Sequence, residues 1–248
     1  LVGGKAAGLG LLIRNNFHVP PGMCLTTQAY KETLQAAGLD LPKQWTHIRR
    51  AAEPARGQML DDCRRLIASL TFPQTLLDLL NRELNCLGIE PATLLAVRSS
   101  ATDEDATEAT FGGQYRTVLG VSRDSMASAI LDCWASLWTH TAFAYRSRMT
   151  KASSPPTAPT MAVIIQPLLA PRAAGVAYSL HPVTGQGNQV VINAVFGLAE
   201  PLMSGSVTPD QYVVETGEEP STWSLIQRDI AEKAAIKVAR PSGLTDQP

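Results

Sequence analysis

The chain has 248 residues, of which 45% are hydrophobic and 17% charged, and its formal net charge is −1. The nearly balanced charge gives no electrostatic reason to expect nucleic acid or a membrane surface as a partner, and no segment reaches the roughly 18 consecutive apolar residues of a membrane-spanning helix. We expect a cytoplasmic protein with a sizeable core, in one large domain or two lobes.

The first part of the chain is predicted to be mainly helical. Gly3 and Gly4 precede a helix that would run to about Asn15, with Lys5 in its first turn, near N–H groups that favour an anion. A surface lysine on an amphipathic helix is the simpler alternative. Apolar residues at helical spacing predict further helices from Thr26 or Thr27 to about Ala37, at residues 58–70 and 73–84, and from a Ser122 cap through Leu137 to Arg148.

Several side chains in these helices are assigned to the core. The four cysteines are widely spaced and include no C-x-x-C pair, so the sequence favours neither a disulfide framework nor a structural zinc site. The aromatic residues of the last helical region are interpreted as core rather than as a stacking platform: Trp134, Trp138, Phe143 and Tyr145.

Strand patterns dominate the second part of the chain. They are predicted there at residues 160–169, 175–180, 189–195, 212–215 and 223–228, and two further strands are predicted among the helices of the first part, at residues 94–97 and 116–121. A helix-rich part followed by a strand-rich part is typical of an α+β fold. We place a first lobe with a phosphate-binding loop at residues 1–168 and a strand-rich second lobe at residues 169–248.

A candidate site follows the strand at residues 94–97. This strand leads into Arg98 and a loop of small residues, and Gly112-Gly113 lies further along. A fixed cation beside free backbone N–H groups suits phosphate oxygens, although glycine pairs also punctuate ordinary solvated loops. The acidic residues of the loop have oxygen ligands that suit Mg²⁺. They are more simply explained as charges that orient or shield Arg98, and we assign no metal ligand among them: Asp103, Glu104, Asp105 and Glu108.

Seven short motifs follow one another along nearly the whole chain. They are Gly3-Gly4-Lys5; Pro21-Gly22 with Leu25-Thr26-Thr27; Val97-Arg98-Ser99-Ser100-Ala101-Thr102 with Glu104-Asp105; Phe111-Gly112-Gly113-Gln114; Gln166-Pro167; Gly175-Val176 with Pro182-Val183-Thr184-Gly185; and Gly197-Leu198-Ala199-Glu200 with Val207-Thr208-Pro209-Asp210. In this order they resemble the N-terminal ATP-grasp domain shared by phosphoenolpyruvate synthase, pyruvate phosphate dikinase and rifampin phosphotransferase.

The resemblance implies a two-lobed ATP-grasp module that cleaves ATP to AMP. A histidine on a separate swivelling domain would carry the phosphoryl group to an acceptor, such as pyruvate or an antibiotic, held by an acceptor-binding domain. The residues that match the family pattern would have these roles: Lys5 and Arg98 contact the phosphates and serve as catalytic cations, Gly112, Gly113 and Thr117 cover the phosphates, Gln166 lies on the hinge beside the adenine, and Glu200 lies near the nucleotide. Phosphoryl transfer needs mainly positioning and neutralisation of charge, which such groups supply.

The sequence also departs from the family pattern. Relatives supply Mg²⁺ ligands and another arginine from D-x-E-W-like and Q-S-R-P-like segments, which are not found here. None of the four histidines lies in a phosphocarrier-like sequence, and each is interpreted as structural or exposed: His18, His47, His140 and His181. Ala199 replaces a glycine of the family, which would restrict the backbone if that position needs a positive φ. We therefore expect a C-terminally incomplete module that is inactive alone, with Mg²⁺ ligands mostly outside this chain.

Alternatives to the multidomain phosphotransferase remain open. One is a free-standing, degenerate nucleotide-binding module that regulates or completes a partner without catalysis. Another keeps the fold and the ATP but activates an acid or amine acceptor for condensation.

Overall fold

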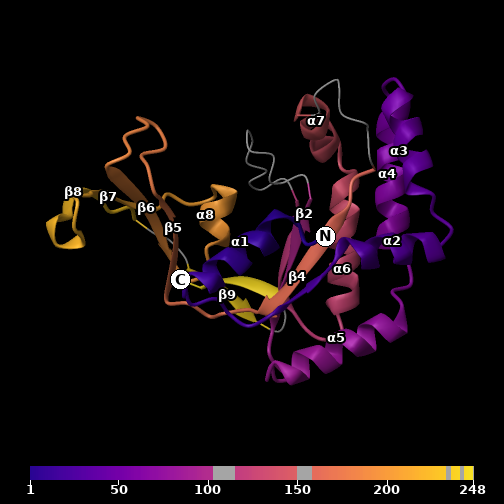
Figure 1. The fold of residues 1–248 in the computed structure, drawn as a ribbon, viewed down its shortest axis with the longest axis horizontal. Coiled ribbons are helices and arrows are strands. Elements are labelled where there is room, and N and C mark those ends of the chain that lie inside the picture. The colour runs from indigo at the N-terminus through magenta and orange to yellow at the C-terminus, as the bar shows by residue number, and fades with distance from the viewer. Residues whose placement is uncertain (103–114, 150–157, 233–235, 241–242, 248) are drawn as a thin grey trace. The chain divides into compact units, whose positions relative to one another are not determined.

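The computed structural model describes residues 1–102, 115–149, 158–232, 236–240 and 243–247 (Figure 1). The chain forms two compact units, Leu1–Leu168 and Leu169–Pro248. Both helices and sheets are present, so the predicted α+β class is confirmed. Within the described residues, none of the helices combines the length and the apolar character that crossing a membrane requires.

The first unit contains helices and one four-stranded sheet. Its elements are α1 (Gly3–Arg14), β1 (Met23–Leu25), α2 (Thr27–Ala36), α3 (Leu41–Arg50), α4 (Ala55–Ala68), α5 (Gln74–Cys86), β2 (Leu95–Ala101), β3 (Thr117–Val121), α6 (Met126–Ala135), the 3₁₀ helix η1 (Ser136–Trp138), α7 (His140–Met149) and β4 (Met161–Pro167). The strand order is β1-β4-β2-β3, with antiparallel neighbours throughout. The long β4–β2 pairing therefore forms the middle of this sheet.

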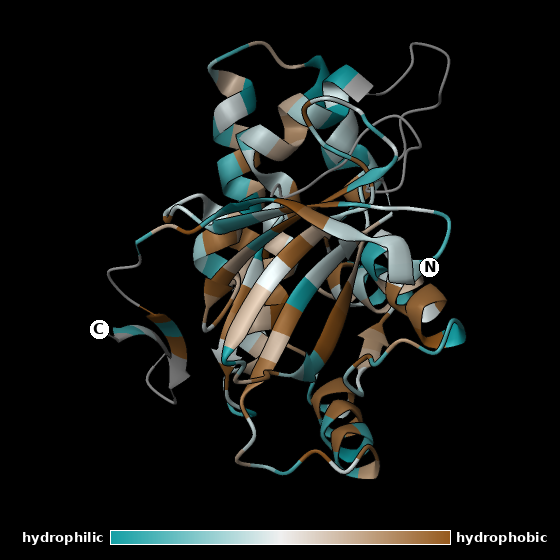
Figure 2. Ribbon diagram, turned by 90° about the vertical axis from the view of Figure 1, so that its left-hand side faces the viewer, coloured by the Kyte–Doolittle hydropathy of each residue, from teal (hydrophilic) through white to brown (hydrophobic). Residues whose placement is uncertain are grey.

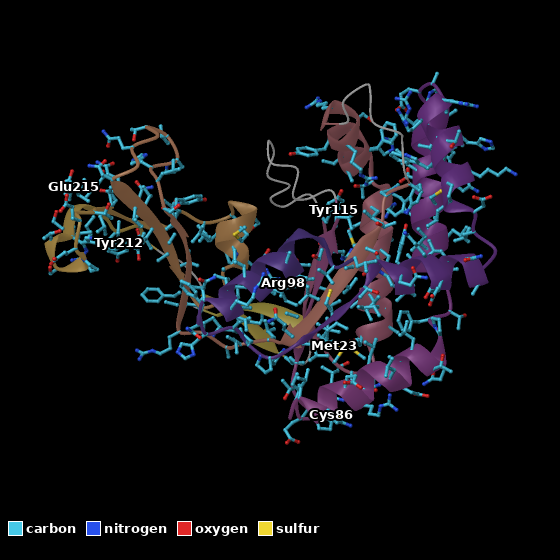
Figure 3. All side chains as sticks on the ribbon, in the orientation of Figure 1. Met23, Cys86, Arg98, Tyr115, Tyr212 and Glu215 are labelled. Carbon is cyan, nitrogen blue, oxygen red and sulfur yellow. The ribbon has the colours of Figure 1, made fainter. Side chains whose placement is uncertain are left out.

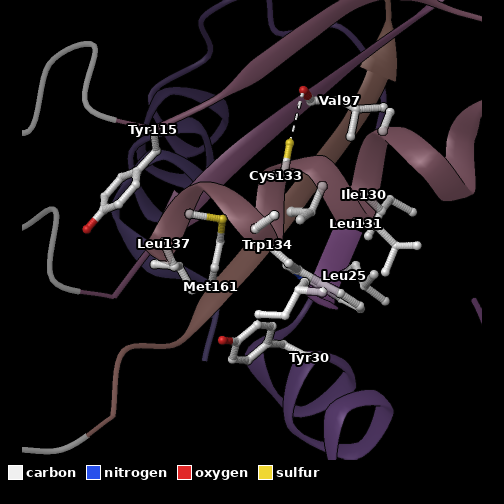
Figure 4. Packing of buried hydrophobic residues seen from close by; sticks show 14 of the residues in the cluster. Leu25, Tyr30, Val97, Tyr115, Ile130, Leu131, Cys133, Trp134, Leu137 and Met161 are labelled. Atoms are coloured by element: carbon white, nitrogen blue, oxygen red, sulfur yellow. Dashed lines mark hydrogen bonds between the residues drawn. The ribbon is translucent and has the colours of Figure 1, made fainter. Parts of the chain in front are cut away.

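The two faces of this sheet have different neighbours. Helix α6 packs on one face, where the Cys133 Sγ atom lies 3.7 Å from the Val97 carbonyl oxygen (Figure 4). Helix α1 lies on the other face, where it is bonded to Ser100. The main core lies on the α6 side and includes the fully buried Trp134 and Trp138 (Figure 4). These two residues and the buried Phe143 confirm the interpretation of the aromatic residues as core.

Two helical predictions need correction. The single helix expected from Ser122 to Arg148 is wrong, because the chain passes through η1 and an extended Thr139, whose ψ is 153°, before α7 begins. The Thr139 hydroxyl then accepts the Ala142 N–H at 3.2 Å, as a helix cap does. Helix α3 was not predicted, although its Asp40 cap, which accepts the Lys43 N–H at 3.0 Å, and its early proline are typical start signals. Figure 2 shows both hydrophilic and hydrophobic residues on the helices, as expected for helices with one buried face.

The second unit is strand-rich. Its elements are β5 (Ala173–Tyr178), β6 (Gln189–Phe196), α8 (Glu200–Ser204), β7 (Asp210–Glu215), the 3₁₀ helix η2 (Pro220–Thr222), β8 (Ser224–Asp229), β9 (Ile236–Arg240) and β10 (Gly243–Gln247). Strands β5 to β8 form an antiparallel meander, and β9 and β10 form a separate hairpin. The predicted strands at residues 175–180, 189–195, 212–215 and 223–228 correspond to the four meander strands within a few residues.

Candidate functional site

Arg98 lies in the middle of β2, on the sheet of the first unit (Figure 3). It is directly opposite Thr117 of β3 and Ile164 of β4. Residues directly opposite in antiparallel strands project from the same face, so Arg98 and Thr117 share one face. Arg98 is half-buried, and among the described residues its guanidinium group makes no hydrogen bond or ion pair. Its charge is therefore available to an anionic ligand on this face.

Gln166 also belongs to this face. It lies opposite Ala96, two residues before Arg98 on β2. The side chain of Gln166 is only 6% exposed, and its amide donates to the Pro20 carbonyl oxygen at 2.9 Å. The side chain thus fixes the turn before β1, and a contact from this position to a ligand would come from the main chain.

Lys5 is fixed to the same face through the first turn of α1. The Ser100 hydroxyl, two residues after Arg98, donates to the Val2 carbonyl oxygen at 2.7 Å and accepts the Ala6 N–H at 3.1 Å. Gly3 has a φ of +68° and lies against the Ser100 carbonyl group, so closely that a Cβ atom would overlap it. The turn that carries Lys5 is thereby attached to the strand that carries Arg98.

The opposite face of the sheet carries an ion pair with α6. Arg116, next to Thr117, lies 3.2 Å from the Asp132 carboxylate of α6. Burial raises the pKa of the neighbouring Cys133 thiol to about 12, and the positive charges of Arg116 and Lys5 oppose this rise only in part. Cys133 is therefore an inert core thiol rather than a nucleophile.

Glu200, the predicted nucleotide residue of the second unit, begins α8. Its carboxylate lies 4.0 Å from the Lys237 ammonium of β9, which lies 2.9 Å from Asp246. The hydrogen bond and charge of Asp246 raise the pKa of Lys237 despite partial desolvation. The preceding Gly197 has a φ of +69° and packs against the Lys237 carbonyl oxygen, 2.5 Å from its ideal Cβ position. Lys237 therefore holds this loop against β9 and was not found from the sequence, because no motif includes it.

Other predicted site residues can be placed only in part. Gly112, Gly113 and the acidic run of residues 103–108 lie outside the described residues. Ala199 has a φ of −73°, so the backbone here does not need the glycine of the family. Among the described residues, no group of three or more His, Cys, Asp or Glu side chains is arranged to hold a metal ion.

One histidine has a clear structural role. The His181 Nδ1 atom accepts the N–H groups of Val183 and Thr184 at 3.3 and 3.2 Å. The imidazole thus fixes the turn at residues 182–185, within the strand-rich unit.

A comparison with protein families shows the family to which the chain belongs. The family model of the pyruvate phosphate dikinase AMP/ATP-binding domain matches residues 1–247. The chain belongs to this family. This AMP/ATP-binding domain is 33% identical over 279 residues to a probable phosphoenolpyruvate synthase of Pyrococcus horikoshii, with 97% of this chain and 33% of that protein covered.

Two further relatives have different names. A rifampicin phosphotransferase of Streptomyces sviceus is 36% identical over 235 residues, covering 93% of this AMP/ATP-binding domain and 26% of that protein. The prodigiosin synthesizing transferase PigC of Serratia marcescens is 36% identical over 220 residues, covering 86% of the domain and 22% of that protein. The chain thus spans about a third of the length of the first curated relatives that it matches.

Proposed function

We propose that this AMP/ATP-binding domain holds ATP for a multidomain phosphotransferase that cleaves ATP to AMP. A histidine on a swivelling domain passes a phosphoryl group to an acceptor on another domain, with pyruvate or a small molecule such as an antibiotic as the acceptor. The two compact units are the lobes of one ATP-grasp module in this proposal. The family match supports it, and it does not favour a regulatory module without catalysis.

The environment of the Arg98 guanidinium group is the observation that supports the proposal most directly. A half-buried guanidinium group without a partner among the described residues would be costly to keep unless it binds an anion. Thr117 shares its face, and the first turn of α1 brings Lys5 to the same strand. We assign Arg98 and Lys5 to the phosphates, Gly112, Gly113 and Thr117 to the phosphate cover, the main chain at Gln166 to the adenine, and Glu200 to the nucleotide.

Mg²⁺ completes the proposed ligand, because it neutralises the phosphate charge of ATP. Within the part of the chain that the structure describes, no three His, Cys, Asp or Glu side chains are grouped to hold the ion. A cytoplasmic location stays a prediction from the composition.

Calorimetric titration of ATP tests this function, with and without MgCl₂. We expect Arg98→Ala to weaken ATP binding about 10- to 100-fold, because it removes charge-assisted hydrogen bonds to phosphate. Arg98→Lys keeps the charge and should retain part of the affinity. Equal ATP affinity of the wild type and Arg98→Ala would contradict the assignment.

The nucleotide products that the full-length protein forms from ATP distinguish the remaining candidate functions. Release of AMP from ATP, followed by ³¹P NMR, is expected of the proposed phosphotransferase, whereas release of ADP alone would contradict it. A second candidate keeps the ATP but activates an acid or amine acceptor for condensation, and the similarity to a prodigiosin synthesizing transferase is a reason to test it. In that case, AMP would form only when both condensation partners are present.

A further inference from the structure

Ser100 connects the two elements that carry the proposed phosphate cations. It is fully buried, lies two residues after Arg98 on β2, and projects from the same face. Its hydroxyl donates to the Val2 carbonyl oxygen and accepts the Ala6 N–H. A hydroxyl has one proton to donate, and here the donor and an acceptor position are both used by α1.

These two partners lie at the two ends of the first turn of α1. Ala6 N–H and Val2 C=O are separated by four residues, which is the spacing of the first hydrogen-bonded pair of an α-helix. Ser100 therefore bonds to both ends of the turn that contains Lys5. Because the adjacent Gly3 lies against the Ser100 main chain, this turn cannot rotate or slide along β2 without breaking several contacts at once.

We propose that Ser100 is a positioning residue that fixes the spacing between the Lys5 ammonium and the Arg98 guanidinium, so that both reach the polyphosphate of one ATP molecule. This inference rests on the proposed function. Two cations on separate elements bind one polyphosphate well only if their separation is set beforehand. In preorganised catalytic sites, a misplacement of about 1 Å lowers the reaction rate by up to about 100-fold.

Ser99 provides a matched control. It is the same residue type, it is equally buried, and it is the next residue along β2. Its side chain projects from the opposite face, and among the described residues its hydroxyl has no hydrogen-bond partner. Ser99→Ala thus removes the same atom from the same strand without touching α1.

The test compares ATP with AMP, which lacks the β- and γ-phosphates. Calorimetry on the full chain should show that Ser100→Ala weakens ATP binding about tenfold and AMP binding less than about twofold. Ser99→Ala should change neither affinity by more than about twofold. A structural defect alone would weaken both nucleotides together.

A double-mutant cycle shows whether Ser100 acts through Lys5. We expect Lys5→Ala and the Lys5→Ala, Ser100→Ala pair to bind ATP equally weakly, because Ser100 has no cation left to position. Ser100→Cys keeps a weak donor and acceptor and should give an intermediate ATP affinity, and it serves as the variant to measure if Ser100→Ala does not fold.

The outcomes separate this inference from the proposed function. If Arg98→Ala loses ATP affinity while both Ser100 variants bind ATP like the wild type, only the positioning role is overturned. Additive effects of the Lys5 and Ser100 substitutions would overturn it as well. If the wild type binds no ATP, the proposed function fails and the inference fails with it.

Discussion

The side-chain amide of Gln166 donates to the Pro20 carbonyl oxygen at 2.9 Å, across 146 residues of sequence. This bond connects the end of β4 to the turn that precedes β1. The side chain that the family pattern places beside the adenine is therefore engaged in holding the fold.

We expect Gln166→Leu to lower the free energy of unfolding by about 1–3 kcal/mol, because the Pro20 carbonyl group loses its donor in a largely buried place. Urea unfolding measures this change. Gln28→Ala is the matched control, since the Gln28 amide donates to Glu32 on an exposed helix face. This substitution should cost less than about 0.5 kcal/mol. Equal stability of Gln166→Leu and the wild type would show that the bond contributes nothing.

Two glycines of α1 should respond in opposite ways to alanine. Gly3 has a positive φ and lies against the Ser100 carbonyl group, so Gly3→Ala should destabilise the protein by about 1–3 kcal/mol. Gly8 has nothing within 4 Å of its Cβ position, so Gly8→Ala should raise stability by up to about 1 kcal/mol through helix propensity. Thermal unfolding of both variants tests the pair. A stable Gly3→Ala protein would mean that α1 does not pack on β2 in this way.

Stability should fall as the pH rises from about 9 towards 12. Burial raises the pKa of Cys133 from 9.0 to about 12, and it also raises the pKa of Tyr30. In this range the unfolded chain loses these protons before the folded chain does, so the folded state loses stability with increasing pH. Urea unfolding at a series of alkaline pH values should show a shallower fall for Cys133→Ala. Identical slopes for the two proteins would rule out a contribution from this thiol.

The four cysteines should react with a thiol reagent at different rates. Cys86 is exposed, whereas Cys24 and Cys63 are half-buried and Cys133 is fully buried. We expect one fast reaction at Cys86, slower reactions at Cys24 and Cys63, and none at Cys133 until the protein unfolds, because the thiolate is the reactive form and burial disfavours it. Mass spectrometry after brief labelling identifies the sites. Cys86→Ser should abolish the fast phase, and labelling of Cys133 in the native protein would contradict the structure.

Periodicity and turn signals predicted most helices and strands because these features are local. The break at Thr139 was missed because the apolar pattern continues across it from α6 to α7, and tertiary packing decides where the helix stops. Helix α3 could have been predicted, since its Asp40 cap and early proline are visible in the sequence.

Less of the candidate site than of the helices and strands could be predicted from the sequence. Arg98 and its motif could be selected from the sequence, but its common face with Thr117 and Gln166 depends on strand register between segments far apart in the chain. A shift of one residue would have moved Arg98 to the other face. The link from Ser100 to the first turn of α1 is equally non-local, and no pattern within either segment reveals it.

The strand order β1-β4-β2-β3 also bears on how the first unit forms during synthesis. Strand β4, one of the two inner strands, is the last of the four to leave the ribosome, and within the described residues β4 is the strand with which β1 pairs. Pairing of such distant segments is slow and exposes apolar edges until it is complete. The nascent chain must therefore keep β1 unpaired until residue 167 has emerged, and shortened chains that end before β4 should depend on chaperones to remain dissolved.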